Sequence, residues 1–303
     1  MSATITVRVP GSTANLGSGF DCVGIAVNRW VGLSVRRASG GALEIERRGA
    51  LAAVRVRPED DLVHRGFARA CRAGGLEPPG VAMEATSDIP VGRGLGSSAA
   101  AIVAGAVAAR ALCDLPLEDQ ALLALCAELE GHPDNVAPSM RGGAVLALRA
   151  PAGGLVVAAL AVHASLELVF AVPDFTLATE RARAVLPANV PHRTAVTAAA
   201  RSAALVLGLA QGDRELLEAG LDDVLHVPYR RALVRGYDAV TTAARGAGAF
   251  GATLSGSGST LVAVAPAACG AAVEAAMTGA WRAEGVTVES FRLARPVGGY
   301  EVS

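Results

Sequence analysis

The chain has 303 residues, of which 52% are hydrophobic and 18% charged, and its formal net charge is −1. This length is enough for about two domains, and the hydrophobic content excludes an intrinsically disordered chain. The near-neutral charge gives no electrostatic reason to expect nucleic acid or an anionic membrane as a partner. All 27 basic residues are arginine. Lysine-based phosphate or Schiff-base chemistry is therefore excluded, and an anion must be held by arginine, backbone amides or a metal ion.

The pattern of hydrophobic residues predicts strands and helices mixed in both halves of the chain. Residues 3–9 alternate as a half-buried strand does, whereas residues 10–21 have the composition of a loop. The pattern predicts an α+β fold with two domains, residues 1–155 and 156–303. Further strands are expected at 25–35, 43–47, 81–85, 143–148, 155–172 (two adjacent strands), 261–264 and 287–293, and helices at 61–73, 97–112, 117–129, 179–186, 195–209, 213–221 and 233–244.

The same sequence predicts a cytoplasmic protein without a membrane span. The apolar run 99–109 ends at Arg110, well short of the roughly 20 residues that cross a bilayer. The first eight residues lack the pattern of a signal peptide. The five cysteines are scattered and form no C-x-x-C pair, so neither zinc nor a disulfide framework is expected.

The strongest local signal is a glycine- and serine-rich turn that leads directly into a helix. Its glycines allow close approach of the backbone to a ligand, and the helix N-terminus adds free amides and a positive dipole end. A helix cap formed by Ser97 would explain part of the pattern without a ligand. A dinucleotide fingerprint also matches formally, with Asp114 as its acid, but Asp114 follows a helix rather than a second parallel strand. The predicted nucleotide-binding segment comprises Pro90, Val91, Gly92, Arg93, Gly94, Leu95, Gly96, Ser97, Ser98, Ala99 and Ala100.

Three motifs spread over the whole chain resemble those of the GHMP kinase family. The segment 90–100 resembles its phosphate-binding motif, 10–21 resembles the first motif, and 255–260 the third. The blocks 128–138, 179–187 and 223–237 are most similar to the homoserine kinase branch of that family. The resemblance implies an N-terminal domain like ribosomal protein S5 domain 2, a ferredoxin-like C-terminal domain, and an active site between them. It implies transfer of the ATP γ-phosphoryl group to L-homoserine, in threonine biosynthesis.

The resemblance also assigns roles to individual residues. Ser97 and Glu130 are the expected Mg²⁺ ligands, with Glu128 as an alternative to Glu130. Asn15 and Asn135 are expected beside the reacting hydroxyl. Other members of the family often have an aspartate as base at the position of Asn135, where this chain has an amide. His132 is the rival candidate for the base; the alternative is that it is an ordered loop residue. The remaining expected substrate contacts are Arg183 and Arg230 to the carboxylate, Asp21 to the ammonium group, and Thr179 and Gly256.

Two departures from the family pattern and several alternatives stay open. Ser259 stands where the third motif usually has proline, and Arg93 occupies a position often taken by a small residue, from which it could contact nucleotide phosphates. The alternatives are a GHMP kinase for mevalonate, a sugar or another small alcohol, a nicotinamide-dependent dehydrogenase, and a non-catalytic sensor on the same fold. A homodimer is left open.

Overall fold

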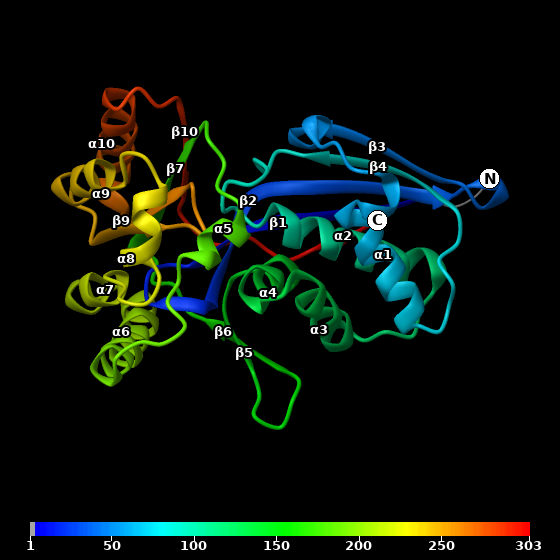
Figure 1. Cartoon of the computed structure of the whole chain (residues 1–303), viewed down its shortest axis with the longest axis horizontal. Helices are drawn as coiled ribbons and strands as arrows, with labels where there is room; N and C mark the ends of the chain where they lie inside the picture. The colour runs from blue at the N-terminus through cyan, green and yellow to red at the C-terminus, as the bar shows by residue number, and fades with distance from the viewer. Residues whose placement is uncertain (1–3) are drawn as a thin grey trace.

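The computed structural model describes residues 4–303, which form two lobes side by side (Figure 1). The N-terminal lobe contains a seven-stranded sheet in the order β11-β1-β2-β4-β3, with β5 paired to the far end of β2 and β6 paired to β5. Only β3 and β4 run parallel. The strands are β1 (Ile5–Asn15), β2 (Gly19–Arg37), β3 (Leu43–Gly49), β4 (Val81–Ser87), β5 (Ala144–Arg149), β6 (Leu155–Leu160) and β11 (Glu301–Val302).

Helices cover one face of this sheet, and α2 lies at their centre (Figure 1). The α1–α2 contact is close because glycines stand where the helices meet. A Cβ atom on Gly66 would lie 2.2 Å from the Ile102 carbonyl oxygen, and one on Gly105 would lie 1.8 Å from that of Val63. The small residues of α2 therefore allow it to be buried along most of its length. The helices are α1 (Leu62–Ala73), α2 (Ser97–Cys113), α3 (Asp119–Glu130) and α4 (Pro133–Arg141).

The C-terminal lobe contains a four-stranded antiparallel sheet in the order β10-β7-β9-β8. Within the described residues, α6 alone has the length and hydropathy of a membrane span, but it packs against α7 through Leu205 and Leu209 and carries Arg201, which pairs with Asp222. The strands are β7 (Leu166–Pro173), β8 (Gly251–Leu254), β9 (Leu261–Pro266) and β10 (Val288–Leu293); the helices are α5 (Thr179–Ala184), α6 (His192–Gln211), α7 (Arg214–Leu221), α8 (Val227–Arg230), α9 (Tyr237–Gly246) and α10 (Gly270–Ala283).

The chain changes lobes between β6 and β7. Because β6 pairs with β5 in the first sheet, a boundary at residue 155 would separate the two strands of a hairpin, and we place the boundary between Leu160 and Leu166. The C-terminal tail then returns to the N-terminal lobe, where β11 pairs with β1. The tip of the β1–β2 hairpin reaches in the opposite direction, to α7 (Figure 1).

Most predicted elements are present, but one local prediction is wrong and several elements were not predicted. Residues 10–15 belong to β1 rather than to a loop, because Gly11, Ser12 and Thr13 pair with β2 in spite of their loop-like composition. Strand β8 and the short strand β11 lie in segments for which no strand was predicted. Helices α4, α8 and α10 were not predicted either; α4 carries Asn135, and it has a proline in its first turn and another in its interior. The predicted two strands within 155–172 are confirmed as β6 and β7.

Candidate active site

A glycine-rich loop, residues 90–96, ends at the N-terminus of α2. Its glycines Gly92, Gly94 and Gly96 have φ of 68°, 76° and 69°, values that L side chains rarely adopt. Gly96 is the helix cap, and no described side chain, including that of Ser97, caps the first turn. The first amides of α2 are therefore available to an anion, and the dipole of the helix favours one there.

The C-terminal lobe fixes the shape of this loop. The Ser255 hydroxyl donates to the Gly94 carbonyl at 2.6 Å, and the Thr260 amide donates to the Arg93 carbonyl at 3.1 Å. The guanidinium of Arg93 donates to the carbonyls of Pro173 and Asp174 at the end of β7. Arg93 is thus directed away from the cavity and joins the loop to the second lobe.

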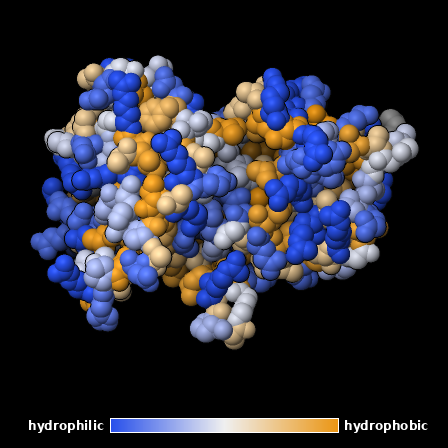
Figure 2. Space-filling view, viewed as in Figure 1, coloured by the Kyte–Doolittle hydropathy of each residue, from blue (hydrophilic) through white to orange (hydrophobic). Residues whose placement is uncertain are grey.

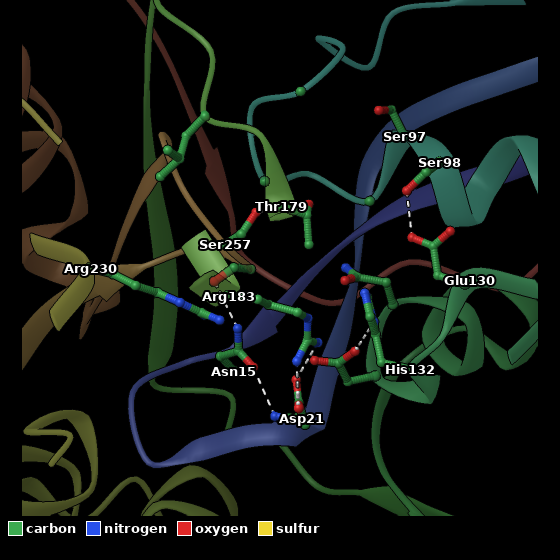
Figure 3. A pocket seen from close by; sticks show the side chains of 17 residues that line it. Asn15, Asp21, Ser97, Ser98, Glu130, His132, Thr179, Arg183, Arg230 and Ser257 are labelled. Atoms are coloured by element: carbon green, nitrogen blue, oxygen red, sulfur yellow. Dashed lines mark hydrogen bonds and ion pairs between the residues drawn. The ribbon is translucent and has the colours of Figure 1, made fainter. Parts of the chain in front are cut away.

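Glu130, the last residue of α3, meets the first turn of α2. The Ser98 hydroxyl donates to its carboxylate at 2.5 Å, whereas the Ser97 side chain points away from it (Figure 3). Burial raises the pKa of Glu130, although the hydrogen bond from Ser98 opposes this effect. Glu128 lies on the outer surface, 3.3 Å from Arg69. The pair that faces the cavity is therefore Ser98 and Glu130.

His132 and Asp134 form a second pair at the start of α4. The His132 Nδ1 atom lies 2.7 Å from an Asp134 carboxylate oxygen, and Asp134 is almost fully buried. Burial of His132 disfavours its charged form, but the hydrogen bond and charge of Asp134 outweigh burial and raise the pKa of His132. A larger share of this imidazole is therefore protonated at neutral pH than in a free histidine.

A serine network fixes the side-chain amide of Asn135. Its Nδ2 donates to the Ser12 carbonyl at 3.3 Å and to the Ser12 hydroxyl at 3.0 Å, while that hydroxyl donates to the Asn135 carbonyl at 3.0 Å. A carbonyl oxygen can only accept, so the nitrogen of the amide must face Ser12. The Oδ1 atom of Asn135 is left as a free acceptor in a side chain that lines the cavity.

The tip of the β1–β2 hairpin, residues 15–21 (the Asn15–Asp21 turn), holds three non-glycine residues with left-handed backbone: Asn15, Leu16 and Asp21, at φ of 71°, 45° and 56°. Such conformations cost of order 1–3 kcal/mol each and cluster at functional sites. Asn15 stabilises the turn from both ends of its amide, since Nδ2 donates to the Gly256 carbonyl at 2.7 Å and Oδ1 accepts from the Asp21 amide at 2.9 Å. Asn15 therefore acts on Asp21 through the backbone.

Two arginines from the C-terminal lobe reach the same space. Arg183 on α5 binds both carboxylate oxygens of Asp21, at 2.9 and 3.1 Å (Figure 3). Arg230 on α8 is 1% exposed, and its tip points toward the cavity. Burial and the nearby charge of Arg183 lower the pKa of Arg230 to about 10. Arg230 is therefore a cation that lacks a carboxylate at hydrogen-bonding distance in residues 4–303.

One cavity between the lobes is lined by every predicted substrate residue, together with His132, Glu130 and five of the predicted loop residues. Leu95, Ala99 and Ala100 lie in the hydrophobic core instead. The sequence did not single out Asp134, Leu177 or Ser257, which also line the cavity; the block 128–138 contained Asp134 without a role. The loop residues at the cavity are Gly92, Gly94, Gly96, Ser97 and Ser98.

A second, apolar cavity of about 300 Å³ adjoins the first and shares five residues with it: Gly92, Ser97, Ser98, Leu177 and Thr179. Its walls include Leu51, Val54, Val56, Val63, Val91 and Ala101, from the segment after β3 and the helices beside it. A space-filling view shows the indentation between the lobes with apolar side chains near it (Figure 2). Val91 belongs to the predicted nucleotide-binding segment, whereas the other wall residues are missed by motif reasoning because they lie outside the recognised motifs.

Comparison with known proteins gives the same assignment along the whole chain. Models of the GHMP kinases N-terminal and C-terminal domains match residues 61–143 and 205–283. The chain is 43% identical to homoserine kinase of Trichormus variabilis over 94% of both chains. The chain belongs to the GHMP kinase family.

Other relatives of this GHMP kinase extend the match. It is 44% identical to homoserine kinase of a Synechococcus species, over 98% of this chain and 97% of that one. The crystal structure of homoserine kinase from Cytophaga hutchinsonii superimposes with a TM-score of 0.89 at 30% identity, over 99% of this chain and 97% of that one. The dehydrogenase interpretation of residues 94–99 is excluded, since Asp114 ends α2 in a left-handed turn and α3 follows.

Proposed function

We propose that this GHMP kinase transfers the γ-phosphoryl group of ATP to the hydroxyl of L-homoserine, forming O-phospho-L-homoserine for threonine biosynthesis. The observation that carries the proposal is the combination in one cavity of a phosphate-binding loop with Arg183, Arg230 and Asp21. These three side chains match a zwitterion, which needs cations for its carboxylate and an anion for its ammonium group. The near full-length relatives called homoserine kinase support the same substrate.

The two cavities suit the two ends of ATP. The amides of the glycine loop and of the first turn of α2 would hold the phosphates. The adjoining apolar cavity would take the adenine base, because apolar walls with a few polar groups favour a flat aromatic ligand. The shared residues, which include Gly92, Ser97 and Ser98, lie where the two parts of the nucleotide would meet.

The donor set beside the phosphate loop fits Mg²⁺. Ser98 and Glu130 supply hydroxyl and carboxylate oxygens, and Mg²⁺ prefers oxygen ligands and takes few of them from protein. Among residues 4–303, no group of three or more histidine, cysteine, aspartate or glutamate side chains forms a metal cluster. When bound, Mg²⁺ would neutralise phosphate charge. We assign the protein ligands to Ser98 and Glu130 in place of the predicted Ser97 and Glu130.

Homoserine would bind charged groups that pair with each other in the free site. Its carboxylate would bind Arg230 and Arg183, and its ammonium group would bind Asp21, so that the Asp21–Arg183 ion pair is replaced by two ion pairs with the substrate. Thr179, Ser257 and Gly256 also line the cavity, and the hydroxyls of Thr179 and Ser257 lie 3.3 Å apart. The substrate carboxylate would thus supply the anionic partner that Arg230 lacks within residues 4–303.

Positioning would account for most of the chemistry. The Oδ1 atom of Asn135 accepts from the substrate hydroxyl and orients its oxygen; this oxygen bonds to γ-phosphorus as the bond to the bridging β–γ oxygen breaks. The hydroxyl proton leaves late in such a loose transition state and passes to an oxygen of the transferred phosphoryl group or to water, so a strong base is not needed. The raised pKa of His132 reduces its neutral fraction, which favours His132 as a cation near the phosphates over His132 as the base.

A coupled ADP-release assay with L-homoserine, D-homoserine, L-serine and mevalonate tests the proposal. We expect turnover with L-homoserine, weak or no turnover with its enantiomer, and none with mevalonate, which lacks the ammonium group that Asp21 would bind. The release of ADP should depend on Mg²⁺. Preferred turnover of mevalonate or of a sugar would replace homoserine as the substrate and leave the kinase assignment intact.

A further inference from the structure

A buried histidine lies directly behind Arg230. Arg230 cannot use water to satisfy its donors, since it is 1% exposed, and a buried cation without partners is costly. Its Nε donates to the Ala182 carbonyl at 3.0 Å, and its Nη1 lies 3.3 Å from Nδ1 of His226. His226 is completely buried, so it contacts the substrate site only through its neighbours.

The surroundings of His226 define its tautomer. The Nε2 atom lies 3.0 Å from the Gly17 carbonyl oxygen, which can only accept, so Nε2 carries the hydrogen. Burial and the charge of Arg230 lower the pKa of His226, against the pull of Asp223. The ring is therefore neutral, and the lone pair on Nδ1 accepts from the guanidinium of Arg230.

The position of the ring is fixed on all sides. Asp223 accepts hydrogen bonds from the amides of Leu225, His226 and Val227, at 2.6–3.0 Å, and so orders the start of α8. The imidazole stacks on Phe20, with ring centroids 4.7 Å apart. The guanidinium of Arg230 lies 5.1 Å from the centre of the same Phe20 ring.

Gly17 and Phe20 belong to the turn that carries Asn15 and Asp21, whereas His226 and Arg230 belong to the C-terminal lobe. The ring of His226 thus lies between the turn that would bind the ammonium group and the arginine that would bind the carboxylate. We propose that His226 is a positioning residue that holds Arg230 in a fixed position relative to the Asn15–Asp21 turn and thereby sets the affinity for the substrate carboxylate. The proposal rests on the proposed function, because it assigns the carboxylate to Arg230.

Two substitutions separate the hydrogen bonds of His226. Asn places its amide near Nδ1, so His226→Asn can keep an acceptor for Arg230. Gln places its amide near Nε2, so His226→Gln keeps a donor to Gly17 but no acceptor beside Arg230. We expect His226→Gln to lower kcat/KM for homoserine about tenfold through KM, the size of one hydrogen bond to a charged group. His226→Asn should stay within about threefold of wild type, and kcat and the KM of ATP should be unchanged in both.

A double-mutant cycle with Arg230→Ala gives the readout that a purely structural role would not produce. If His226 acts through Arg230, the tenfold effect of His226→Gln disappears in the Arg230→Ala background. An equal tenfold loss in both backgrounds, a parallel rise in the KM of ATP, or a larger loss in His226→Asn than in His226→Gln would overturn the proposal. Absence of homoserine turnover by the wild-type chain would instead refute the proposed function, which the first arm of the experiment reveals before any variant is compared.

Discussion

Two glutamates two positions apart differ completely in what surrounds them. Glu130 is half-buried beside Ser98 and the N-terminus of α2, whereas Glu128 is exposed and pairs with Arg69. The sequence left open which of the two binds a metal, because an i, i+2 pair lies on different sides of a helix and the sequence alone does not fix which side faces the site. The same reason explains why the hydroxyl beside Glu130 is that of Ser98 rather than of Ser97.

We expect Glu130→Gln to raise the Mg²⁺ concentration that gives half-maximal activity by about tenfold or more, since a charged ligand becomes neutral. Glu128→Gln is the matched control and should change it by less than about twofold, because exposed ion pairs contribute little. Mg²⁺ titrations at saturating ATP measure both values. Equal effects of the two substitutions would remove Glu130 from the metal site.

The same experiment carries a pH dependence. Burial raises the pKa of Glu130, so Mg²⁺ must displace a proton as the pH falls toward that pKa, and the affinity for Mg²⁺ should weaken on the acidic side. This weakening should be smaller in Glu130→Gln, which has no proton to lose. An identical pH profile for the two proteins would show that another group controls metal binding.

At the scale of elements, local composition predicts α2 and its glycine turn well, but not the elements whose conformation depends on distant partners. The segment Gly11–Thr13 forms a strand because it pairs with β2 and because Ser12 is hydrogen-bonded to Asn135. Helix α4 forms in spite of its prolines since the surrounding sheet and helices bury it. The site itself depends on long-range contacts such as those of Ser98 with Glu130, Ser12 with Asn135 and Asp21 with Arg183, so the sequence could name its residues only through family motifs.

The conformation of the glycine-rich loop 90–96 depends on the absence of a side chain at Gly94. A Cβ atom there would lie 2.1 Å from the Ser255 carbonyl oxygen and 2.8 Å from that of Gly258, at a φ of 76°. We expect Gly94→Ala to move the loop away from the C-terminal lobe and to raise the KM of ATP at least about tenfold, the result of losing about 1.4 kcal/mol of binding.

Gly40 provides the control for backbone strain alone. Its φ is 65°, and a Cβ atom there would meet nothing within 4 Å. Gly40→Ala should lower stability by about 1 kcal/mol and leave the KM of ATP unchanged. If the two variants raised this KM equally, the contact with Ser255 would have no role in shaping the nucleotide site.

At the scale of the molecule, the two lobes are joined at more places than the single change of sheet between residues 160 and 166. The hairpin tip bonds to the second lobe through the Ser18 amide and the Gly220 carbonyl, at 3.1 Å. The C-terminal tail returns to the first lobe, where the Tyr300 hydroxyl bonds to Arg110 at 2.6 Å and to Asp119 at 2.8 Å. Each lobe thus contacts a segment of the other, and neither keeps these contacts when the other unfolds. The two lobes should therefore unfold together as one cooperative unit.

The only two tryptophans allow this cooperativity to be measured, since Trp30 lies on β2 and Trp281 on α10. In Trp30→Phe and Trp281→Phe, the fluorescence of the remaining tryptophan and the far-UV circular dichroism of the whole chain should give one midpoint of urea unfolding. Tyr300→Phe removes hydrogen bonds in the first lobe and should lower stability by about 1–2 kcal/mol. Added to Trp30→Phe, it should shift the Trp281 midpoint although its contacts lie in the other lobe. A Trp281 transition that does not move with Tyr300→Phe would show that the lobes unfold independently and that the tail does not transmit stability between them.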